Sequence, residues 1–237
     1  MSEKPRAPEP VQLVLVGATG MVGRQVMERG VGRHDVRIAA LARREVPLPP
    51  GARMEMLVAD PAHWGEAIRA AAPQVVVIAL GTTIRAVGGD KAAFRAVDHD
   101  LVIGVAQAAK AAGVPHVIAV SSVGAASGAS NFYLSVKGET EDALARLHFD
   151  RLDLIRPGLL LGKREGPLRL GEKIAMALSP VLSPLLMGKW RQYRSIRAAT
   201  VAEVILALAQ LKVRGRFVHD YDSMQRVLHT ARRNRGE

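Results

Sequence analysis

The feature that most constrains the fold is a short apolar segment that ends on three regularly spaced glycines. Residues 11–16 read VQLVLV, and Gly17, Gly20 and Gly23 follow at intervals of three residues. The apolar run is typical of a buried strand, and residues 21–29 continue with the pattern of a helix. Glycines at these places allow a tight turn, a close approach of the main chain to a pyrophosphate, and tight packing of the helix on the strand. The segment therefore predicts a dinucleotide-binding turn, with a glycine-rich turn that binds nothing as the weaker alternative.

Strand-like apolar runs alternate with helix-like segments along almost the whole chain. The candidate strands are residues 11–16, 36–42, 54–59, 74–80, 116–121, 152–156 and 216–219. The candidate helices are residues 21–29, 62–71, 91–112, 131–147, 170–178, 201–211 and 223–233. This alternation predicts an α/β fold, a doubly wound parallel sheet of the Rossmann type with helices on both faces. No repeat or linker divides the chain, so we expect a disordered leader over residues 1–10 and a single NAD(P)-binding domain over residues 11–237.

The region after the sixth candidate strand is expected to form a small C-terminal lid. In this fold class the ligand lies beyond the carboxyl ends of the strands, so residues 159–200 are placed on the substrate side. Within them, residues 173–194 join an apolar stretch to a basic end that contains Trp190 and Tyr193. We expect this stretch to pack over the mouth of the site, and contact with an anionic membrane surface is the alternative.

The composition excludes several kinds of site and partner. The 237-residue chain has no cysteine, which excludes disulfides and cysteine nucleophiles, and its seven histidines show no ligand spacing, so no metal is expected. The net charge is +11, but aromatic residues make up 4% of the chain and no stacking platform accompanies the arginines, so nucleic-acid binding is not expected. No apolar stretch reaches the roughly 20 residues that a membrane span needs. We expect a cytoplasmic protein with a small-molecule substrate, and a homodimer is compatible with the sequence.

The end of the second strand carries Arg43 and Arg44, where NAD-binding proteins usually have an acidic residue. Guanidinium groups suit a 2′-phosphate, so NADP(H) is the expected cofactor and NAD(H) the alternative. Asp60 ends the third strand and is expected either to bind the adenine amino group or to cap the next helix. The residues expected at the cofactor in the first turn and after the fourth strand are Gly17, Thr19, Gly20, Met21, Val22, Gly23, Leu80, Gly81, Thr82 and Thr83.

A serine pair and a Tyr-x-x-x-Lys pattern point to the chemistry. Ser121 and Ser122 end the fifth strand, and Tyr133 and Lys137 lie four residues apart on one face of the next helix. A phenol has a reference pKa near 10, and a neighbouring ammonium together with an oxidised nicotinamide favours the phenolate, which suits general acid–base catalysis. Ser122 would hold the substrate oxygen, and Lys137 would also bind the nicotinamide ribose. A half-buried tyrosine beside a solvated lysine is the alternative interpretation of the pair.

In combination, these motifs resemble those of the atypical short-chain dehydrogenase/reductases, and within them the HIV-1 Tat-interacting protein 2 group of oxidoreductases. The resemblance covers about residues 11–165 and rests on VGATGMVG at 16–23, LGTT at 80–83, VDHD at 97–100, SSVGA at 121–125, NFYLSVKGE at 131–139 and FDRLDLIRPG at 149–158. It implies a Rossmann fold that binds NADP(H), with Ser122, Tyr133 and Lys137 as the catalytic trio.

The resemblance also carries expectations for the neighbouring residues. It implies that Arg156, Pro157 and Gly158 lie against the nicotinamide, and Ser121 is also expected to bind the cofactor. In larger members of the superfamily an asparagine on the fourth helix completes a proton relay, and Asp98 occupies a comparable place here. Asp98 is therefore expected either to join such a relay or to be no more than a polar helix residue.

Together the motifs favour an NADPH-dependent oxidoreductase that transfers hydride between nicotinamide and a small carbonyl or alcohol, with Tyr133 as the general acid or base. A redox-sensing or scaffold protein that binds NADPH without turnover is the alternative. A nucleotide-sugar epimerase or dehydratase ranks lower, because about 80 residues after the sixth strand leave little room for the larger substrate domain of those enzymes.

Overall fold

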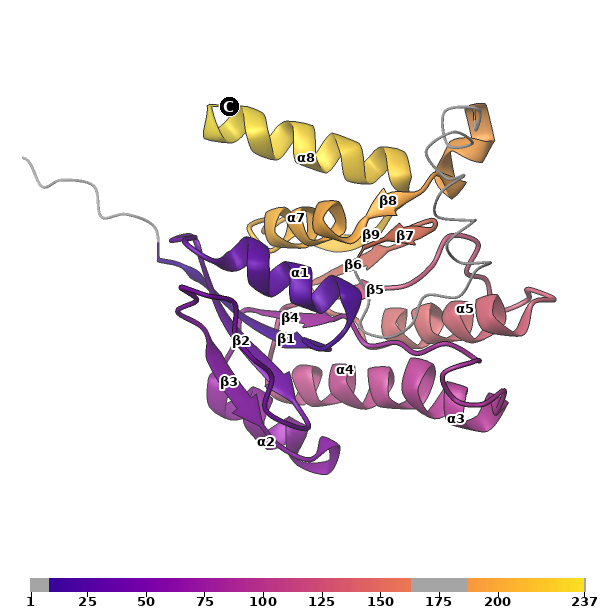
Figure 1. Ribbon diagram of the computed structural model, residues 1–237, viewed down its shortest axis with the longest axis horizontal. Helices are drawn as coiled ribbons and strands as arrows, with labels where there is room; N and C mark the ends of the chain where they lie inside the picture. Colours follow the sequence, from indigo (N-terminus) through magenta and orange to yellow (C-terminus); the bar gives the residue numbers. More distant parts are fainter. Residues whose placement is uncertain (1–8, 163–186, 237) are drawn as a thin grey trace, which may run out of the picture.

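A seven-stranded sheet, in which every strand runs parallel to its neighbours, forms the centre of the protein (Figure 1). The computed structural model describes residues 9–162 and 187–236. The strand order is β3-β2-β1-β4-β5-β6-β9. Strands β2 and β3 lie on one side of β1 and the later strands on the other, so the strand order reverses between β1 and β4. The strands are β1 Val11–Val16, β2 Val36–Ala42, β3 Glu55–Val58, β4 Val75–Ile78, β5 His116–Val120, β6 Arg151–Ile155 and β9 Gly215–His219. The predicted doubly wound α/β fold is confirmed.

Helices cover both faces of the sheet (Figure 1). Helices α1, α7 and α8 share one hydrophobic core with one face, and α2, α4 and α5 share a second core with the other. The α-helices are α1 Met21–Gly30, α2 Trp64–Ala71, α3 Lys91–Arg95, α4 Val102–Ala111, α5 Phe132–Ala145, α7 Ala198–Leu208 and α8 Tyr221–Arg235. Shorter elements are the 3-10 turns η1 Pro61–His63 and η4 Gly188–Tyr193, and the π-helical turn η2 Ala96–Leu101.

The alternation of side chains along β1 explains why two cores form. Leu13 and Leu15 point into the core under α1 and α7, whereas Val14 and Val16 point into the core over α4. Successive side chains of a strand face opposite sides of a sheet. A run that is apolar at every position therefore suits a central strand, buried on both faces, as the sequence predicted.

The structure corrects the predicted elements in two places. The helix predicted over residues 91–112 is divided into α3 and α4 by the π-helical turn η2. A separate two-stranded parallel sheet, β7 Leu160–Leu161 with β8 Ile196–Arg197, was not predicted. The helix predicted over residues 170–178 lies outside the described residues, as do most of the predicted leader and most of the predicted lid.

Two further findings concern membrane contact, the alternative interpretation of residues 173–194. Among the described residues, no helix combines the length and apolar character needed to cross a membrane. Most of the stretch 173–194 lies outside the described residues. Its described end, η4, exposes the side chain of Trp190, whose ring packs 5.8 Å from that of Tyr193.

The turn from β1 into α1 is packed so closely that two of its positions require glycine. Gly17 has φ +99°, and a Cβ there would lie 2.6 Å from the carbonyl carbon of Ala79 at the end of β4. A Cβ on Gly23 would lie 2.1 Å from the carbonyl oxygen of Gly17. Both distances are far below any van der Waals contact, so these glycines hold β1, β4 and α1 together at the point where the strand order reverses.

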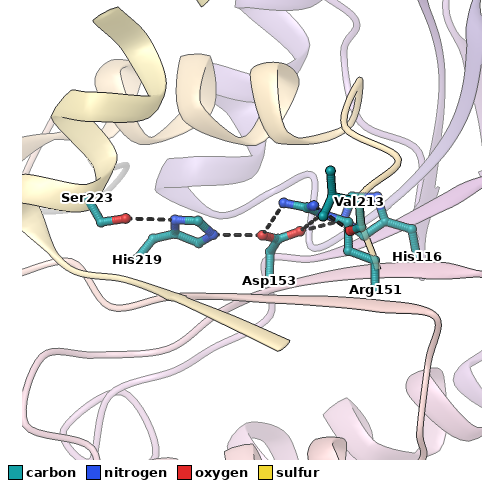
Figure 2. Close-up of polar contacts among 6 residues, drawn as sticks. All are labelled: His116, Arg151, Asp153, Val213, His219 and Ser223. Atoms are coloured by element: carbon teal, nitrogen blue, oxygen red, sulfur yellow. Dashed lines mark hydrogen bonds and ion pairs between the residues drawn. The ribbon is translucent and has the colours of Figure 1, made fainter. Parts of the chain in front are cut away.

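A buried cluster of charged side chains joins the other half of the sheet to α8 (Figure 2). The fully buried carboxylate of Asp153 accepts hydrogen bonds from His116 and His219, both at 2.7 Å, and from two nitrogens of Arg151 at 2.6 and 2.9 Å. His219 also contacts the hydroxyl of Ser223 at 3.1 Å through its other ring nitrogen. These residues come from β5, β6, β9 and α8, so the cluster connects three strands to the last helix.

The partners of Asp153 determine its protonation. Burial alone would raise the pKa of this carboxyl, but the hydrogen bonds from His116, His219 and Arg151 together outweigh it and hold the pKa well below its ordinary value. Since the carboxylate is ionised, both imidazoles donate to it through Nε2. The charge of Asp153 is then balanced by Arg151 within the cluster.

We predict that Asp153→Asn lowers the free energy of unfolding by about 3–5 kcal/mol, because the buried guanidinium of Arg151 loses its counter-charge. The depressed pKa means that the stabilisation is complete above the ordinary carboxyl range and is lost as the pH falls below about 4. Chemical denaturation at several pH values measures both effects. Asp150→Asn is the matched control, because that carboxylate is half exposed and faces an exposed arginine, so a change of about 0.5 kcal/mol or less is expected. Equal effects of the two substitutions would contradict the prediction.

For the glycine turn, we predict that Gly23→Ala both destabilises the protein and weakens NADPH binding by about ten-fold or more, because the new methyl group displaces the carbonyl of Gly17. Gly104→Ala, on the exposed side of α4, is the control, since a Cβ there meets nothing within 4 Å. That substitution should be neutral or stabilise by up to about 1 kcal/mol. Denaturation and nucleotide fluorescence titration distinguish the two variants, and normal NADPH affinity in Gly23→Ala would refute the packing argument.

Candidate functional site

A cavity of about 640 Å³ opens at the carboxyl ends of the central strands. It is bounded by the turn after β1, by the segments after β4, β5 and β6, and by the start of α5. This is where a parallel sheet with a reversal of strand order offers a ligand crevice. The cavity brings together these residues predicted from the sequence: Thr19, Gly20, Met21, Val22, Arg44, Leu80, Gly81, Thr82, Thr83, Ser121, Ser122, Tyr133, Lys137, Pro157 and Gly158.

The predicted residues outside this lining have other roles. Gly17 and Gly23 form the packed turn beneath the cavity. Arg43 is exposed and absent from the described lining, whereas its neighbour Arg44 is part of it. Asp60 lies away from the cavity and caps η1, where its carboxylate accepts the N–H of Ala62 at 3.0 Å. The structure therefore favours the capping interpretation of Asp60.

The first turn of α1 is suited to an anion. Gly20 occupies the N-cap, and the first turn contains no acidic residue. The N–H groups of such a turn, together with the helix dipole, attract negative charge. Arg24 also lines the cavity, and its Nε donates to the carbonyl of Thr19 at 3.1 Å. Arg24 was not predicted from the sequence, although a cation one residue after the third glycine is a signal that the sequence contains.

The residues present fit a pyridine nucleotide in three respects. Gly20 has no side chain that could cover the start of α1. A Cβ there would lie 3.3 Å from the carbonyl oxygen of Gly17. The buried Oγ of Ser121, which lines the cavity, has no hydrogen-bond partner among the described residues. The cavity volume falls within the range of small-molecule and cofactor sites. These are the properties that a dinucleotide site requires.

Helix α5 places the two candidate catalytic side chains. Asn131 caps the helix by accepting the N–H of Leu134 at 3.2 Å, and Tyr133 and Lys137 follow one turn apart. Both side chains reach the cavity, where Ser122 also lies. The ring of Tyr133 is supported by Phe94, with 5.7 Å between ring centroids. The structure thus brings Ser122, Tyr133 and Lys137 into one cavity, as the spacing predicted.

Gly138, the residue after Lys137, sets the close approach of α5 to the segment that follows β5. A Cβ on Gly138 would lie 2.1 Å from the carbonyl carbon of Ala126 and 2.2 Å from the nitrogen of Ser127. Because that segment also carries Ser122, the glycine fixes the distance between the serine and the helix. Gly138 belongs to the motif NFYLSVKGE, but no role was predicted for it from the sequence.

Arg156 is placed differently from the expectation. Its side chain turns to α5 and donates to the buried carboxylate of Glu141 at 2.9 and 3.1 Å, and it is absent from the described lining of the cavity. The hydrogen bonds that Arg156 donates to Glu141 are the main reason that the pKa of Arg156 is raised, against the lowering effect of burial. Pro157 and Gly158 do line the cavity. The side chain of Arg156 therefore anchors α5, and the two residues after it form the cavity wall.

The structure places Asp98 beside Lys137, whereas the sequence left the role of this residue undecided. Its carboxylate, fully buried on η2, lies 2.7 Å from Nζ of Lys137 and accepts the N–H of Thr82 at 2.7 Å. Both Asp98 and Lys137 line the cavity. Asp98 is therefore part of the site, in direct contact with the candidate catalytic lysine.

Comparisons with known proteins agree with this architecture. The sequence profile of the NAD(P)H-binding family matches residues 17–211. Protein FMP52, mitochondrial, from Candida albicans is 31% identical over 208 residues, which cover 85% of this chain and 89% of that protein. The structure of UDP-glucose 4-epimerase from Thermus thermophilus in complex with NAD has a TM-score of 0.65 at 18% identity, covering 95% of this chain and 84% of that one. The structure of dTDP-4-dehydrorhamnose reductase from Bacillus anthracis in complex with NADP has a TM-score of 0.64 at 12% identity, covering 95% and 82%.

These comparisons concern two expectations, the choice of cofactor and the location of the protein. At such low identity the solved structures show the fold alone, and they hold NAD in one case and NADP in the other, so they do not distinguish the two cofactors. The FMP52 relatives are named mitochondrial proteins, which contradicts the expected cytoplasmic location. A lack of cysteine fits several compartments, which is why composition gave the wrong location. With its matched profile and its FMP52 relatives, the chain belongs to the NAD(P)H-binding family.

Proposed function

We propose that this protein is an NADPH-dependent oxidoreductase of the short-chain dehydrogenase/reductase type, acting on a small carbonyl compound or the corresponding alcohol. The proposal rests on one observation, that Ser122, Tyr133 and Lys137 line the same cavity as the glycine turn. The sequence resemblance to the Tat-interacting protein 2 group supports the same assignment. When bound, the reduced nicotinamide supplies the hydride.

The chain offers a binding group for each part of the nucleotide. The N-terminus of α1 at Gly20 would hold the pyrophosphate, and Arg44 would pair with the 2′-phosphate. Lys137 would bind the nicotinamide ribose, and the wall formed by Pro157 and Gly158 would face the ring. NADP(H) is favoured over NAD(H) because the cavity wall carries the guanidinium of Arg44 and the described lining contains no acidic residue except Asp98, whose charge faces Lys137.

The proton chemistry belongs to the residues at the end of β5 and the start of α5. Ser122 would donate a hydrogen bond to the carbonyl oxygen of the substrate and hold the carbonyl carbon toward the nicotinamide. As hydride adds to that carbon, the hydroxyl of Tyr133 would transfer its proton to the oxygen, which yields the alcohol. The phenolate that remains is stabilised by the ammonium of Lys137 on the same helix face and is reprotonated from solvent.

The lid assignment rests on the two described ends of residues 159–200. Leu159 and Leu160 line the cavity, and β7 pairs with β8 beside it. A Cβ on Gly158 would lie 2.4 Å from the carbonyl oxygen of Arg194, so the end of β6 and the residues before β8 are packed in direct contact. The described residues Leu159 and Leu160 therefore lie at the cavity, and those before β8 pack against the neighbouring Gly158, which supports the lid assignment.

We predict that Tyr133→Phe lowers kcat for NADPH-dependent carbonyl reduction by about 100-fold or more, the usual contribution of a general acid, while NADPH affinity stays within about three-fold. A panel of aldehydes, ketones and quinones, followed by NADPH absorbance, measures the rate. Tyr221→Phe is the control, since that tyrosine begins α8 and is not among the residues that line the cavity. Full activity in Tyr133→Phe would refute the mechanism. NADPH binding with no turnover of any substrate by the wild type would instead favour the sensing or scaffold role.

We predict that Arg44→Ala weakens NADPH binding by about ten-fold or more and leaves NADH binding unchanged, because a charge-assisted hydrogen bond contributes about 1.5–3 kcal/mol. Arg43→Ala is the matched control, with the same change of charge one residue away but outside the described cavity lining. Calorimetric titration of the three proteins with both nucleotides gives the comparison. The same loss for NADH as for NADPH would show that Arg44 does not read the 2′-phosphate.

A further inference from the structure

The ion pair between Asp98 and Lys137 is almost completely removed from solvent. The exposed fraction of the side chain is 1% for Asp98 and 7% for Lys137, and 2.7 Å separates Oδ1 from Nζ. Taking a carboxylate or an ammonium out of water is costly, and the loss of either partner leaves an uncompensated buried charge. In the described part of the chain, Asp98 is the acidic residue that contacts Lys137. The ammonium of Lys137 therefore has its counter-charge in this carboxylate.

The second oxygen of the same carboxylate fixes the main chain after β4. Oδ2 of Asp98 accepts the N–H of Thr82 at 2.7 Å, and Thr82 belongs to the segment Leu80–Thr83 that lines the cavity. A Cβ on Gly81 would lie 3.4 Å from Oδ1 of Asp98 and 3.8 Å from Nζ of Lys137. The carboxylate thus lies directly beneath this segment and connects it to the lysine on α5.

The backbone that carries Asp98 is itself irregular. The residue lies on the π-helical turn η2, and its carbonyl oxygen accepts a hydrogen bond from the hydroxyl of Thr140 on α5 at 3.0 Å. The same hydroxyl contacts the carbonyl of Val136 at 2.8 Å. π-helical turns occur often at functional sites, since the extra residue moves one side chain relative to a regular helix. Here the turn presents Asp98 to both Thr82 and Lys137.

We propose that Asp98 is a positioning residue that holds the ammonium of Lys137 and the Thr82 turn in one arrangement and supplies the counter-charge of Lys137 inside the site. The role of this lysine in catalysis rests on the function proposed above, but the balance of the two charges does not. The arrangement differs from a relay through an asparagine. An amide in place of the carboxylate would still accept the N–H of Thr82 but would carry no charge to balance the lysine.

Neighbouring charges are largely committed to other partners. On α5, Glu141 pairs with Arg156 and Glu139 pairs with Arg95, while Tyr133 is the titratable group that shares the cavity. Beside Asp98 on η2, His99 faces the carboxylate of Asp100. Among the described residues, Glu141 lines a small cavity with Asp98 and Lys137, but its charge is balanced by Arg156.

The test uses Asp98→Asn, with Asp100→Asn as the matched control on the same turn. Asp100 has a side chain that is 62% exposed and pairs with His99, so its replacement removes the same charge outside the site. Each full-length protein is treated with a limiting amount of acetic anhydride over a range of pH, and acetylation of Lys137 is followed by mass spectrometry. The reagent modifies only the uncharged amine, and the other lysines provide the internal reference.

In Asp98→Asn we expect the pH of half-maximal acetylation of Lys137 to fall by at least about one unit relative to the wild type, because burial disfavours an uncompensated ammonium. Asp100→Asn should match the wild type. With turnover established, the pH–rate profile of Asp98→Asn should move to lower pH in parallel. Identical acetylation profiles of Asp98→Asn and the wild type would overturn the proposal, whereas the absence of turnover in the wild type would affect only the proposed function.

The contact of Asp98 with Thr82 is tested separately, by the affinity for NADPH. Asp98→Ala loses the acceptor for the N–H of Thr82, which Asp98→Asn retains, and we expect it to bind NADPH about ten-fold more weakly than Asp98→Asn, as for one buried hydrogen bond. Equal affinities would show that the carboxylate does not hold this turn.

If Asp98→Asn does not fold, stability provides the test. The double variant Asp98→Asn/Lys137→Met removes both charges and should recover a folded, cooperatively unfolding protein, since the buried ammonium is then gone. A double variant that stays as unstable as Asp98→Asn would overturn the ion-pair argument.

Discussion

The close contact of backbone with backbone at the end of β1 is the constraint on which the site depends. Gly17 lies against the carbonyl of Ala79 at the end of β4, and Gly23 lies against the carbonyl of Gly17. No side chain larger than hydrogen fits at either place, so α1 must start next to the crevice between β1 and β4. The N–H groups of its first turn then face the cavity, and the segments after β4 and β5 form the opposite wall. An anion site at this point follows from packing before any ligand is considered.

Helix α5 is held against this frame by charges on one of its faces. Tyr133, Lys137 and Glu141 follow at intervals of four residues, and the last two pair with Asp98 and Arg156. One anchor comes from η2 and the other from the end of β6, so the helix is fixed from both sides. The tyrosine at the free end of this row is the residue without a charged partner of its own, and Phe94 supports its ring. Tyr133 and Lys137 therefore line the cavity from one face of a helix that is fixed at both anchors.

Local patterns predicted most of the frame, and tertiary contacts determined what they could not predict. The VQLVLV run, the glycine spacing and the Tyr-x-x-x-Lys pair are short-range signals, and the structure places their residues as expected. The pairing of Arg156 with Glu141 could not be predicted from the sequence, because it joins side chains 15 residues apart on different elements. A resemblance between motifs does not show which way a side chain points. The strands β7 and β8 were missed for a similar reason, since each has two residues and no periodicity to detect. Arg44 lines the cavity and Arg43 does not, and this difference also depends on the direction of each side chain at the end of the strand.

Two buried aspartates show why burial of a charge does not by itself indicate function. Asp153 is surrounded by Arg151 and two histidines, its charge is balanced within the cluster, and its contacts join β5, β6, β9 and α8, so its role is to stabilise the fold. Asp98 has one cation, Lys137, and that cation borders the cavity. A change of charge at Asp98 therefore leaves a cation that borders the cavity without its counter-charge, whereas a change at Asp153 affects a cluster inside the sheet. The number of compensating groups and their access to the cavity distinguish the two buried carboxylates.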